Sequence, residues 1–304
     1  MAYQDFLEGF SKAQGVGDVH TLLNEFGTRY SFQINSRKRA QDLIKALHKK
    51  VAIDPKEMKI LDVGCAYGSF TIELAKLGAE VVGIDISDKW LKLAEINARD
   101  EVDVVFLNCD ASSRKARYQL EQYGPFDLVI INDALEHIYD TAGLLDNLCA
   151  LLREEGLLYY KVPNGHATRH VLSEGHKKVF GITQLPPDYW HLYVKAPFHI
   201  YYRRWEYFDA LFNHYNLSHK MHFNEIHDRS IKQTRRHILK DYEKIRAHLE
   251  LKNFENPIQF AHVRRACEYY FEELETDVEI MDWEELFRKY RVTFWEGVLQ
   301  KQIT

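Results

Sequence analysis

Five short apolar runs alternate with four helical stretches between residues 58 and 163 of this 304-residue chain. The runs read "KILDVG", "EVVGID", "DVVFLNCD", "FDLVII" and "LLYYKVP". Strands that are apolar throughout and separated by single helices predict a parallel sheet with helices on both faces. Because such crossovers are right-handed, the sheet is doubly wound. The sequence therefore predicts a mostly parallel α/β domain over residues 58–217.

Helical segments are predicted on both sides of this domain. Residues 1–57 contain "TLLNEFGTRY" and "SRKRAQDLIKALHKKV", whose apolar spacing predicts an N-terminal helical cap. The aromatic-rich residues 188–215 predict an antiparallel closing hairpin and a helix. Residues 218–304 are charged and amphipathic, which predicts a helical C-terminal extension that acts as a lid or an oligomer surface.

Charge and composition exclude several classes of partner. The net charge is −5 and the pI is about 6.3, so we expect neither nucleic-acid nor anionic-membrane binding. No stretch approaches the ~18 consecutive apolar residues of a membrane span. The four cysteines lack metal-ligand spacing, which predicts a reducing, cytoplasmic location. The first residues, "MAYQDFLEGFSKAQG", do not have the pattern of a signal peptide.

The loop after the first predicted strand is nearly free of large side chains. It reads Gly64-Cys65-Ala66-Tyr67-Gly68 and leads into a helix. In open parallel sheets, ligands bind beyond the carboxyl ends of the strands, next to the first strand. The next run ends at Asp85, where a carboxylate can accept hydrogen bonds from a ribose diol. These features predict an adenosine-type cofactor.

Two details separate the candidate cofactors. A dinucleotide site prefers G-x-G-x-x-G, but Ala66 replaces the second glycine and Ser69 the third. Asp62 lies at the end of the strand, where its charge would repel a pyrophosphate and suits a cationic ligand. A sulfonium compound with an α-ammonium group is such a ligand. An NAD-linked oxidoreductase stays open as an alternative.

The ordered motifs resemble those of a known enzyme family. The segments "ILDVGCAYGSF", "GAEVVGIDIS", "FLNCDA", "FDLVIINDALEHI" and "LLYYKVPN" are similar to class I S-adenosylmethionine-dependent methyltransferases. Within them, they most resemble the subgroup that contains the ubiquinone-biosynthesis O-methyltransferases. The resemblance covers residues 58–164 and implies a Rossmann-like domain that uses S-adenosyl-L-methionine. Ala66 departs from it, since the family most often has glycine there.

The resemblance also implies which residues bind the cofactor. Those on the first loop would line its methionine and ribose portion: Asp62, Gly64, Ala66, Tyr67 and Gly68. Asp85, at the end of the second strand, would bind the ribose. Ile86, Asp110 and Ala111 would contact the adenine. Asn132 and Asp133, after the fourth strand, would border the methionyl end. Arg37 and Arg39 are further candidates for the cofactor carboxylate.

Two histidines are candidate catalytic bases. His137 follows the fourth strand, where the family delivers its methyl group, and an imidazole can take the proton of an acceptor hydroxyl. Alternatively, His137 orders the cofactor pocket through its neighbour Glu136. His191 is the second candidate.

Other residues are weighed as metal ligands or acceptor contacts. His166 and His170 share one helix face, but no carboxylate accompanies them, so no metal is expected. Eight aromatic residues are candidates for an acceptor wall: Tyr189, Trp190, Tyr193, Phe198, Tyr201, Tyr202, Trp205 and Phe208. Aromatic residues at these spacings more often build core and hairpin packing, so we expect two or three of the eight to contact the substrate.

The sequence thus favours a methyltransferase that acts on an oxygen of a small molecule or sugar unit. N-methylation of a small molecule is one alternative. The other is a non-catalytic cofactor-binding scaffold that engages a partner through its helical C-terminal third. A homodimer formed through the C-terminal helices is also expected.

Overall fold

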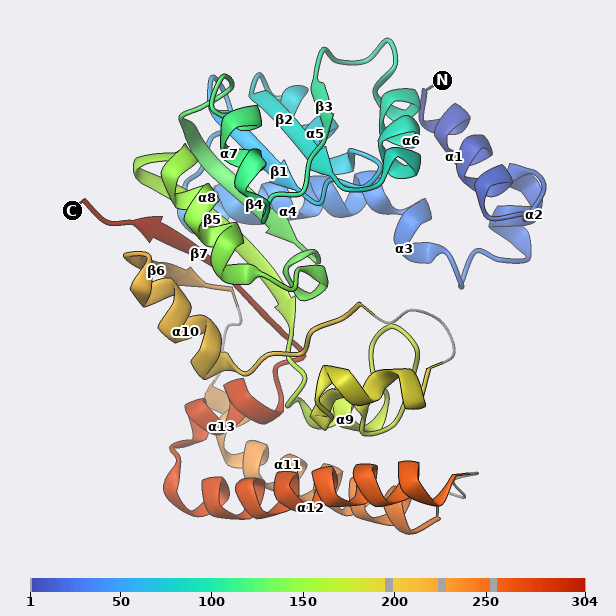
Figure 1. Cartoon of the computed structure of the whole chain (residues 1–304), viewed down its shortest axis with the longest axis vertical. Coiled ribbons are helices and arrows are strands. Elements are labelled where there is room, and N and C mark those ends of the chain that lie inside the picture. Colours follow the sequence, from blue (N-terminus) through green and yellow to red (C-terminus); the bar gives the residue numbers. More distant parts are fainter. Residues whose placement is uncertain (1, 195–198, 224–227, 252–255, 304) are drawn as a thin grey trace.

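A seven-stranded sheet organises the upper part of the molecule (Figure 1). The structure is a computed structural model that describes residues 2–194, 199–223, 228–251 and 256–303; for residues 228–234 and 251, only the backbone is described. The strand order is β3-β2-β1-β4-β5-β7-β6. The first five strands are parallel, as predicted. They are β1 (Lys59–Val63), β2 (Glu80–Asp85), β3 (Val105–Asn108), β4 (Phe126–Asn132) and β5 (Leu152–Pro163).

Helices cover both faces of this sheet, which explains why its strands are apolar throughout. In β4, Val129 and Ile131 pack on one face, toward α7 (Arg114–Leu120), α8 (Thr141–Leu151) and α10 (Trp205–His214). Leu128 and Ile130 alternate with them and pack on the other face, against α4 (Ser36–Val51) and α5 (Ser69–Ala75). The predicted doubly wound α/β fold is confirmed.

The antiparallel strands that close the sheet lie elsewhere than predicted. β7 (Phe294–Lys301) pairs antiparallel with β5 and with β6 (Leu217–His222). The sheet is closed by antiparallel strands, as predicted, but they do not lie within residues 188–215. The described residues of that stretch form the short helix η3 (Pro187–Leu192) and α10, which is the helix predicted there. The sheet therefore extends into the segment that was expected to be wholly helical.

Helices at the start of the chain pack beside the first strands. They are α1 (Ala2–Ala13), α2 (Val19–Asn24), α3 (Ser31–Ile34) and α4 (Ser36–Val51). Phe6 and Phe10 of α1 pack with Leu93 of α6 (Asp88–Ala98) in a separate apolar cluster. This arrangement brings α3 and the start of α4 close to the loop after β1.

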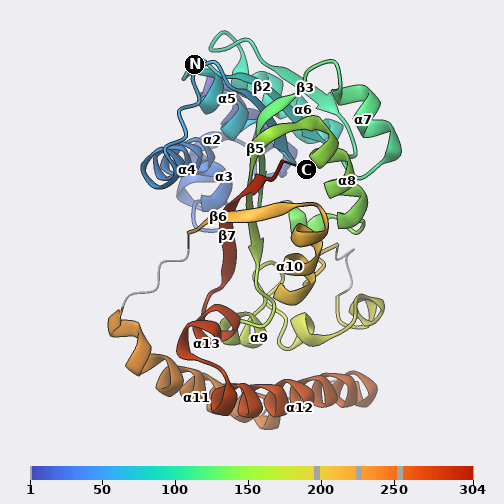
Figure 2. The same ribbon diagram turned by 90° about the vertical axis from the view of Figure 1, so that its left-hand side faces the viewer.

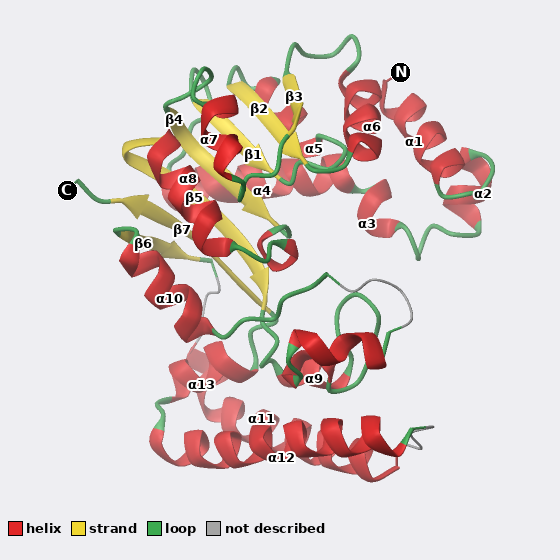
Figure 3. Cartoon of the chain, viewed as in Figure 1, coloured by secondary structure: helices red, strands yellow, loops and turns green. Residues whose placement is uncertain are grey.

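The segments between β5 and β7 build a second, helical lobe (Figures 2 and 3). It contains α9 (Thr168–Leu172), η2 (Ile182–Gln184), η3, α11 (Asp228–Leu251), α12 (Pro257–Ile280) and α13 (Trp283–Tyr290). These elements share a core that includes Val171, Ile182, Trp190, Ile245 and Leu274. Within the described residues, no helix combines the length and apolar character needed to cross a membrane.

Candidate cofactor and acceptor site

Two adjoining cavities lie at the carboxyl ends of the parallel strands. The smaller one, of about 430 Å³, reaches the ends of β1, β2 and β3. The larger one, of about 570 Å³, extends from β1 and β4 toward the helical lobe. Both are lined by Gly64, Ala66, Asp133 and His137. An elongated ligand can therefore occupy both cavities at once.

The loop after β1 has an unusual backbone conformation where the two cavities meet. Gly64, Ala66 and Gly68 have φ angles of 72°, 48° and 71°. A Cβ at Gly64 would lie 2.6 Å from the Cβ of Ala134, and one at Gly68 would lie 2.5 Å from the Phe106 ring. These glycines are thus required by the backbone conformation and by close packing within the chain.

Asp85 is the last residue of β2, and its carboxylate holds the loop after β1 in place. Its Oδ2 accepts a hydrogen bond from the Ala66 amide at 3.0 Å, and its Oδ1 accepts one from Ser87 at 2.8 Å. Burial raises the pKa of Asp85, and these amide bonds oppose the shift. The carboxylate is half-buried in the wall of the smaller cavity and retains acceptor capacity for a ligand.

The rest of the smaller cavity combines an apolar surface with two acids, Asp110 and Asp133. Ile86 is exposed at its edge, and Ala111 is buried in its wall. Asp110 is exposed and accepts hydrogen bonds from the backbone and hydroxyl of Ser112. Trp90 also lines this cavity. This surface suits a flat, partly apolar group with a polar edge.

Asp62 is buried beneath the larger cavity. Its Oδ2 accepts hydrogen bonds from the Thr71 hydroxyl at 2.7 Å and from the Thr71 amide at 3.2 Å. Burial raises the pKa of Asp62 to about 6 despite these bonds. The carboxyl group therefore holds the start of α5 to β1, and a cation in the cavity would favour its ionised form.

Opposite charges meet at the end of β4. Asp133 forms ion pairs with Arg39 at 2.9 Å and with Lys161 at 3.2 Å. Asn132 donates to Asp133 and accepts a hydrogen bond from Tyr159. All but Tyr159 line the larger cavity, which thus offers both an anion and two cations to a ligand.

The structure separates the two arginines that the sequence grouped together. Arg39 lines the larger cavity. Arg37 is buried away from it, where its guanidinium bonds Glu73 at 2.7 Å and the Asn97 carbonyl at 2.6 Å. Arg37 therefore joins α4 to α5 and α6, and Arg39 is the one available to a ligand.

Tyr67 contributes to both the cavity and the packing of the N-terminal helices. Its ring lies 5.3 Å from that of Phe6 and 5.9 Å from that of Trp90. Its carbonyl accepts a hydrogen bond from Asn97 at 2.7 Å. These contacts hold the loop against α1 and α6.

His137 faces the junction of the cavities from η1 (Leu135–His137). Its Nδ1 lies 2.8 Å from the carbonyl of His199, so this nitrogen carries the hydrogen. Partial enclosure lowers the pKa of His137, which favours the neutral ring with a free lone pair on Nε2. The neighbouring Glu136 is buried in the wall of the larger cavity, and burial raises its pKa to about 8.

Comparison with known proteins identifies the family to which this chain belongs. Residues 33–233 match a family model that is described as a methyltransferase domain. This match spans more than half of the chain. The chain belongs to the methyltransferase domain family. The family that the sequence motifs predicted is thereby confirmed.

Relatives within this methyltransferase family match a shorter segment. The ubiquinone biosynthesis O-methyltransferase of Colwellia psychrerythraea is 32% identical over 117 residues, 38% of this chain and 46% of that protein. The protein of the same name from Albidiferax ferrireducens is 32% identical over 115 residues, 38% of this chain and 45% of that protein. The chain therefore spans less than half the length of these curated relatives.

Solved methyltransferase structures are similar at low sequence identity. A putative S-adenosylmethionine-dependent methyltransferase from Listeria monocytogenes is 15% identical, with a TM-score of 0.48. That similarity covers 84% of this chain and 96% of the other. Magnesium protoporphyrin IX methyltransferase from Synechocystis PCC 6803, solved with bound SAM, is 17% identical with a TM-score of 0.42. It covers 63% of this chain and 73% of the other.

Several predicted site residues lie outside the two cavities. His191 is exposed on η3 and lines neither cavity. His166 lies 3.3 Å from Glu273 and lines neither cavity, whereas His170 bonds the Asn164 carbonyl and does line the larger cavity. Phe198 lies outside the described residues. The other seven aromatic candidates do not line either cavity, and Trp190 and Phe208 are core residues.

Several residues of the larger cavity were not predicted from the sequence. Its aromatic wall is formed by Phe32, Phe70 and Phe294, from α3, α5 and β7. Lys161 of β5 pairs with Asn132, the last residue of β4, so its location near a strand end is a usable signal. His176 follows α9 in a loop, and nothing in its local sequence places it near β4.

Proposed function

We propose that this chain is an S-adenosyl-L-methionine-dependent methyltransferase. The observation that carries the proposal is the pair of adjoining cavities with four shared lining residues at the carboxyl ends of β1, β2 and β4. The adenosine would occupy the smaller cavity, and the methionyl group would extend into the larger one. Family membership supports the same cofactor.

The polar residues match this cofactor group by group. Asp85 is available to the ribose hydroxyls, while Ile86, Asp110 and Ala111 surround the space proposed for adenine. In the larger cavity, Arg39 and Lys161 can bind the cofactor carboxylate. Asp62 and Asp133 can interact with its positively charged ammonium and sulfonium groups. Gly64, Ala66, Tyr67 and Asn132 complete the proposed contacts. Gly68 lines neither cavity and contributes through the shape of the loop.

The proposed acceptor is a hydroxyl group of a small molecule or sugar unit. It would approach the methyl group from the aromatic wall of the larger cavity. His137 lies where the cavities meet, and its Nε2 lone pair can promote loss of the hydroxyl proton. The relatives named O-methyltransferases support oxygen as the acceptor. His191 has no role in this proposal.

Calorimetry with S-adenosylhomocysteine and NADH tests the cofactor. We expect binding of the former and none of the latter. Asp85→Asn should weaken S-adenosylhomocysteine binding about 10- to 100-fold, because each hydrogen bond to a charged group contributes about 1.5–3 kcal/mol. Asp103→Asn is a control, since Asp103 is exposed and lines neither cavity. NADH binding, or no effect of Asp85→Asn, would refute the assignment.

A non-catalytic scaffold would also bind the cofactor, so turnover must be measured separately. Labelled S-adenosylmethionine with panels of phenols, sugars and amines should give methylated product from a hydroxyl acceptor. Product from amines alone would indicate N-methylation, and cofactor binding without any product would favour the scaffold. The proposal includes a cytoplasmic location, supported by four free cysteines, and dimerisation through α11 and α12, which light scattering can check.

A further inference from the structure

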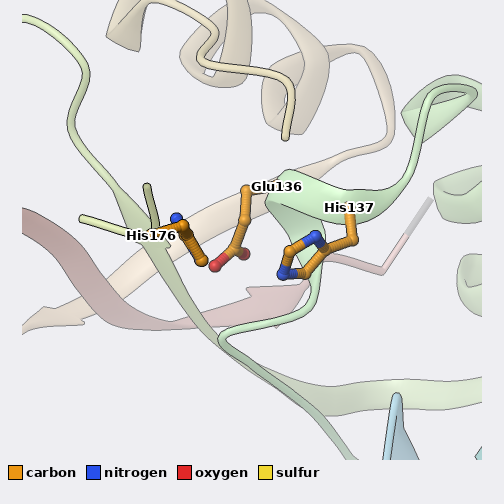
Figure 4. A group of neighbouring side chains, drawn as sticks. All are labelled: Glu136, His137 and His176. Carbon is orange, nitrogen blue, oxygen red and sulfur yellow. The ribbon is translucent and has the colours of Figure 1, made fainter. Parts of the chain in front are cut away.

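Two imidazole rings line the same wall of the larger cavity. His137 belongs to η1, and His176 belongs to the loop after α9. Their ring centroids are 5.5 Å apart, and the Glu136 carboxylate lies between the two rings (Figure 4). One proton must leave the acceptor hydroxyl during methyl transfer. The hydrogen-bond partners of the two rings therefore decide which ring is better suited to take that proton.

His176 is hydrogen-bonded to a buried carboxylate. Its Nδ1 lies 2.8 Å from Oε1 of Glu174, whose side chain is fully buried. Because an ionised carboxylate only accepts hydrogen bonds, Nδ1 carries the hydrogen and Nε2 keeps its lone pair. A carboxylate in this position holds the imidazole in the correct tautomer and stabilises the imidazolium that forms when Nε2 takes a proton.

Glu174 is held in place as an ionised carboxylate. It accepts hydrogen bonds from the Tyr202 hydroxyl and from the amides of His176 and Lys177, each at 2.5 Å. Burial opposes its ionisation, but the bonds from His176, Tyr202 and these amides lower the pKa of Glu174 to about 2. Near neutral pH, the carboxylate beside His176 is therefore negatively charged.

The corresponding partner of His137 is uncharged. Its Nδ1 donates to the His199 carbonyl at 2.8 Å. Burial lowers the pKa of His137, so this ring holds an added proton less tightly. Burial also raises the pKa of the neighbouring Glu136 to about 8, so its carboxyl group is mostly protonated near neutral pH. Of the two rings, His176 is the one hydrogen-bonded to a negative charge that can balance the proton.

The other titratable groups near His176 do not replace Glu174 in this role. The Tyr202 hydroxyl lies 3.4 Å from Nδ1 of His176 and donates its hydrogen to Glu174. His170 lines the same cavity, and burial lowers its pKa, so its ring is mostly uncharged near neutral pH. A positive charge on His176 is thus balanced by Glu174.

We propose that His176 is the base that takes the proton of the acceptor hydroxyl, and that Glu174 is its positioning residue. This inference rests on the proposed function of the chain. The proton goes to His176 instead of His137, which contacts the hydroxyl group without taking its proton.

The proposed step balances without a further reactant. Nε2 of His176 takes the hydroxyl proton while the hydroxyl oxygen forms a bond to the methyl carbon. The carbon–sulfur bond breaks at the same time, and its electron pair stays on sulfur, so the cofactor leaves as a neutral thioether. The imidazolium then releases the proton to solvent, because the side chain of His176 is 35% exposed.

Turnover of labelled S-adenosylmethionine with the phenol or sugar that gives the most product tests the base. His176→Ala should lower kcat about 10²- to 10⁴-fold. Imidazole added to the buffer should restore part of this activity, because it can occupy the space of the deleted ring. His191→Ala is the matched control and should keep the parent activity, since His191 is exposed outside the cavities.

Glu174 variants test the positioning residue. Glu174→Gln should lower kcat at least about 10-fold and leave the KM values of cofactor and acceptor unchanged, because it removes the charge that balances the imidazolium. Glu174→Asp keeps the charge and should recover part of the loss. A kcat of Glu174→Gln equal to that of the parent chain would overturn the inference, even if His176→Ala does not fold.

His137→Ala separates the two candidate bases. Imidazole should not restore this variant, and restoration of His137→Ala instead of His176→Ala would overturn the inference, as would full activity of His176→Ala. S-adenosylhomocysteine should bind the His176 and Glu174 variants within about twofold of the parent chain, because the adenosine cavity contains neither residue. Product formation with full activity of His176→Ala would refute this inference alone. Absence of product with every acceptor would refute the methyltransferase proposal as well.

Discussion

Ala66 adopts a left-handed backbone conformation in the loop that joins the two cavities. Its φ angle is 48°, and its amide donates to Asp85. This conformation costs a residue with a Cβ about 1–2 kcal/mol, a cost that glycine does not have. The hydrogen bond to Asp85 and the flanking glycines hold Ala66 there. The loop therefore depends on one carboxylate for its shape.

Replacing Ala66 by glycine should relieve this strain. We expect Ala66→Gly to raise the free energy of unfolding by about 0.5–1 kcal/mol, because the relief exceeds the added entropy of the unfolded chain. Gly64→Ala should have the opposite effect, since its Cβ would lie 2.6 Å from that of Ala134. Urea unfolding of both variants checks this. A loss of stability in Ala66→Gly would contradict it.

Some residues of the candidate site could be predicted from the sequence, and others could not. Asp62, Asp85 and Asp133 could be found from the sequence because each lies at or next to the end of an apolar strand. Arg39 could be named but not separated from Arg37, since the difference depends on the rotation of α4 against the sheet. His176 could not be found, because only the path of the chain after β5 brings it to Glu136.

At the scale of elements, the sheet was predictable where its strands are buried on both faces. The two closing strands were not. β6 reads "LSHKMH" and is polar and partly exposed at the sheet edge, so its pattern does not differ from that of a loop. β7 follows three helices, and its pairing with β5 is determined by contacts distant in sequence.

Leu299 of β7 tests the contribution of this closing strand. Its side chain is fully buried and pairs across from Leu158 of β5. Leu299→Ala should lower the free energy of unfolding by about 2–5 kcal/mol, because it leaves a cavity in the main core. Ile303→Ala, whose side chain is 65% exposed, should change it by less than about 0.5 kcal/mol. Similar small effects in both variants would mean that β7 is not part of the folded sheet.

At the scale of the whole molecule, Glu273 joins separate segments of the helical lobe. From α12 it forms ion pairs with Lys289 of α13 at 2.6 Å, with His166 at 3.3 Å and with Arg204 before α10. Burial opposes ionisation, but His166 and Lys289 together lower the pKa of Glu273 to about 2. The charge of this one carboxylate therefore stabilises the attachment of the lobe.

The stability of the chain should consequently fall in acid through Glu273. Its folded-state pKa of about 2 lies below its ordinary value of 4.5, so the unfolded state binds the proton more tightly. The stabilisation is present above pH 4.5 and is lost as the pH falls toward 2. Glu273→Gln should lower the free energy of unfolding at pH 6 by about 2 kcal/mol and flatten this acid-dependent loss. Denaturant unfolding at several pH values measures both; an unchanged profile would contradict the assignment.

The position of β7 between β5 and β6 has a consequence for biosynthesis. A ribosome makes β5 and β6 first and then α11, α12 and α13 before it reaches residues 294–301. Until then, the outer edge of β5 has no strand to pair with, and Phe294 is absent from the cavity wall. A nascent chain thus carries an open, apolar sheet edge for the whole of that interval. The cavity wall is complete only after β7 has been translated, so we expect chains that end before residue 294 to lack a complete site and to aggregate more readily.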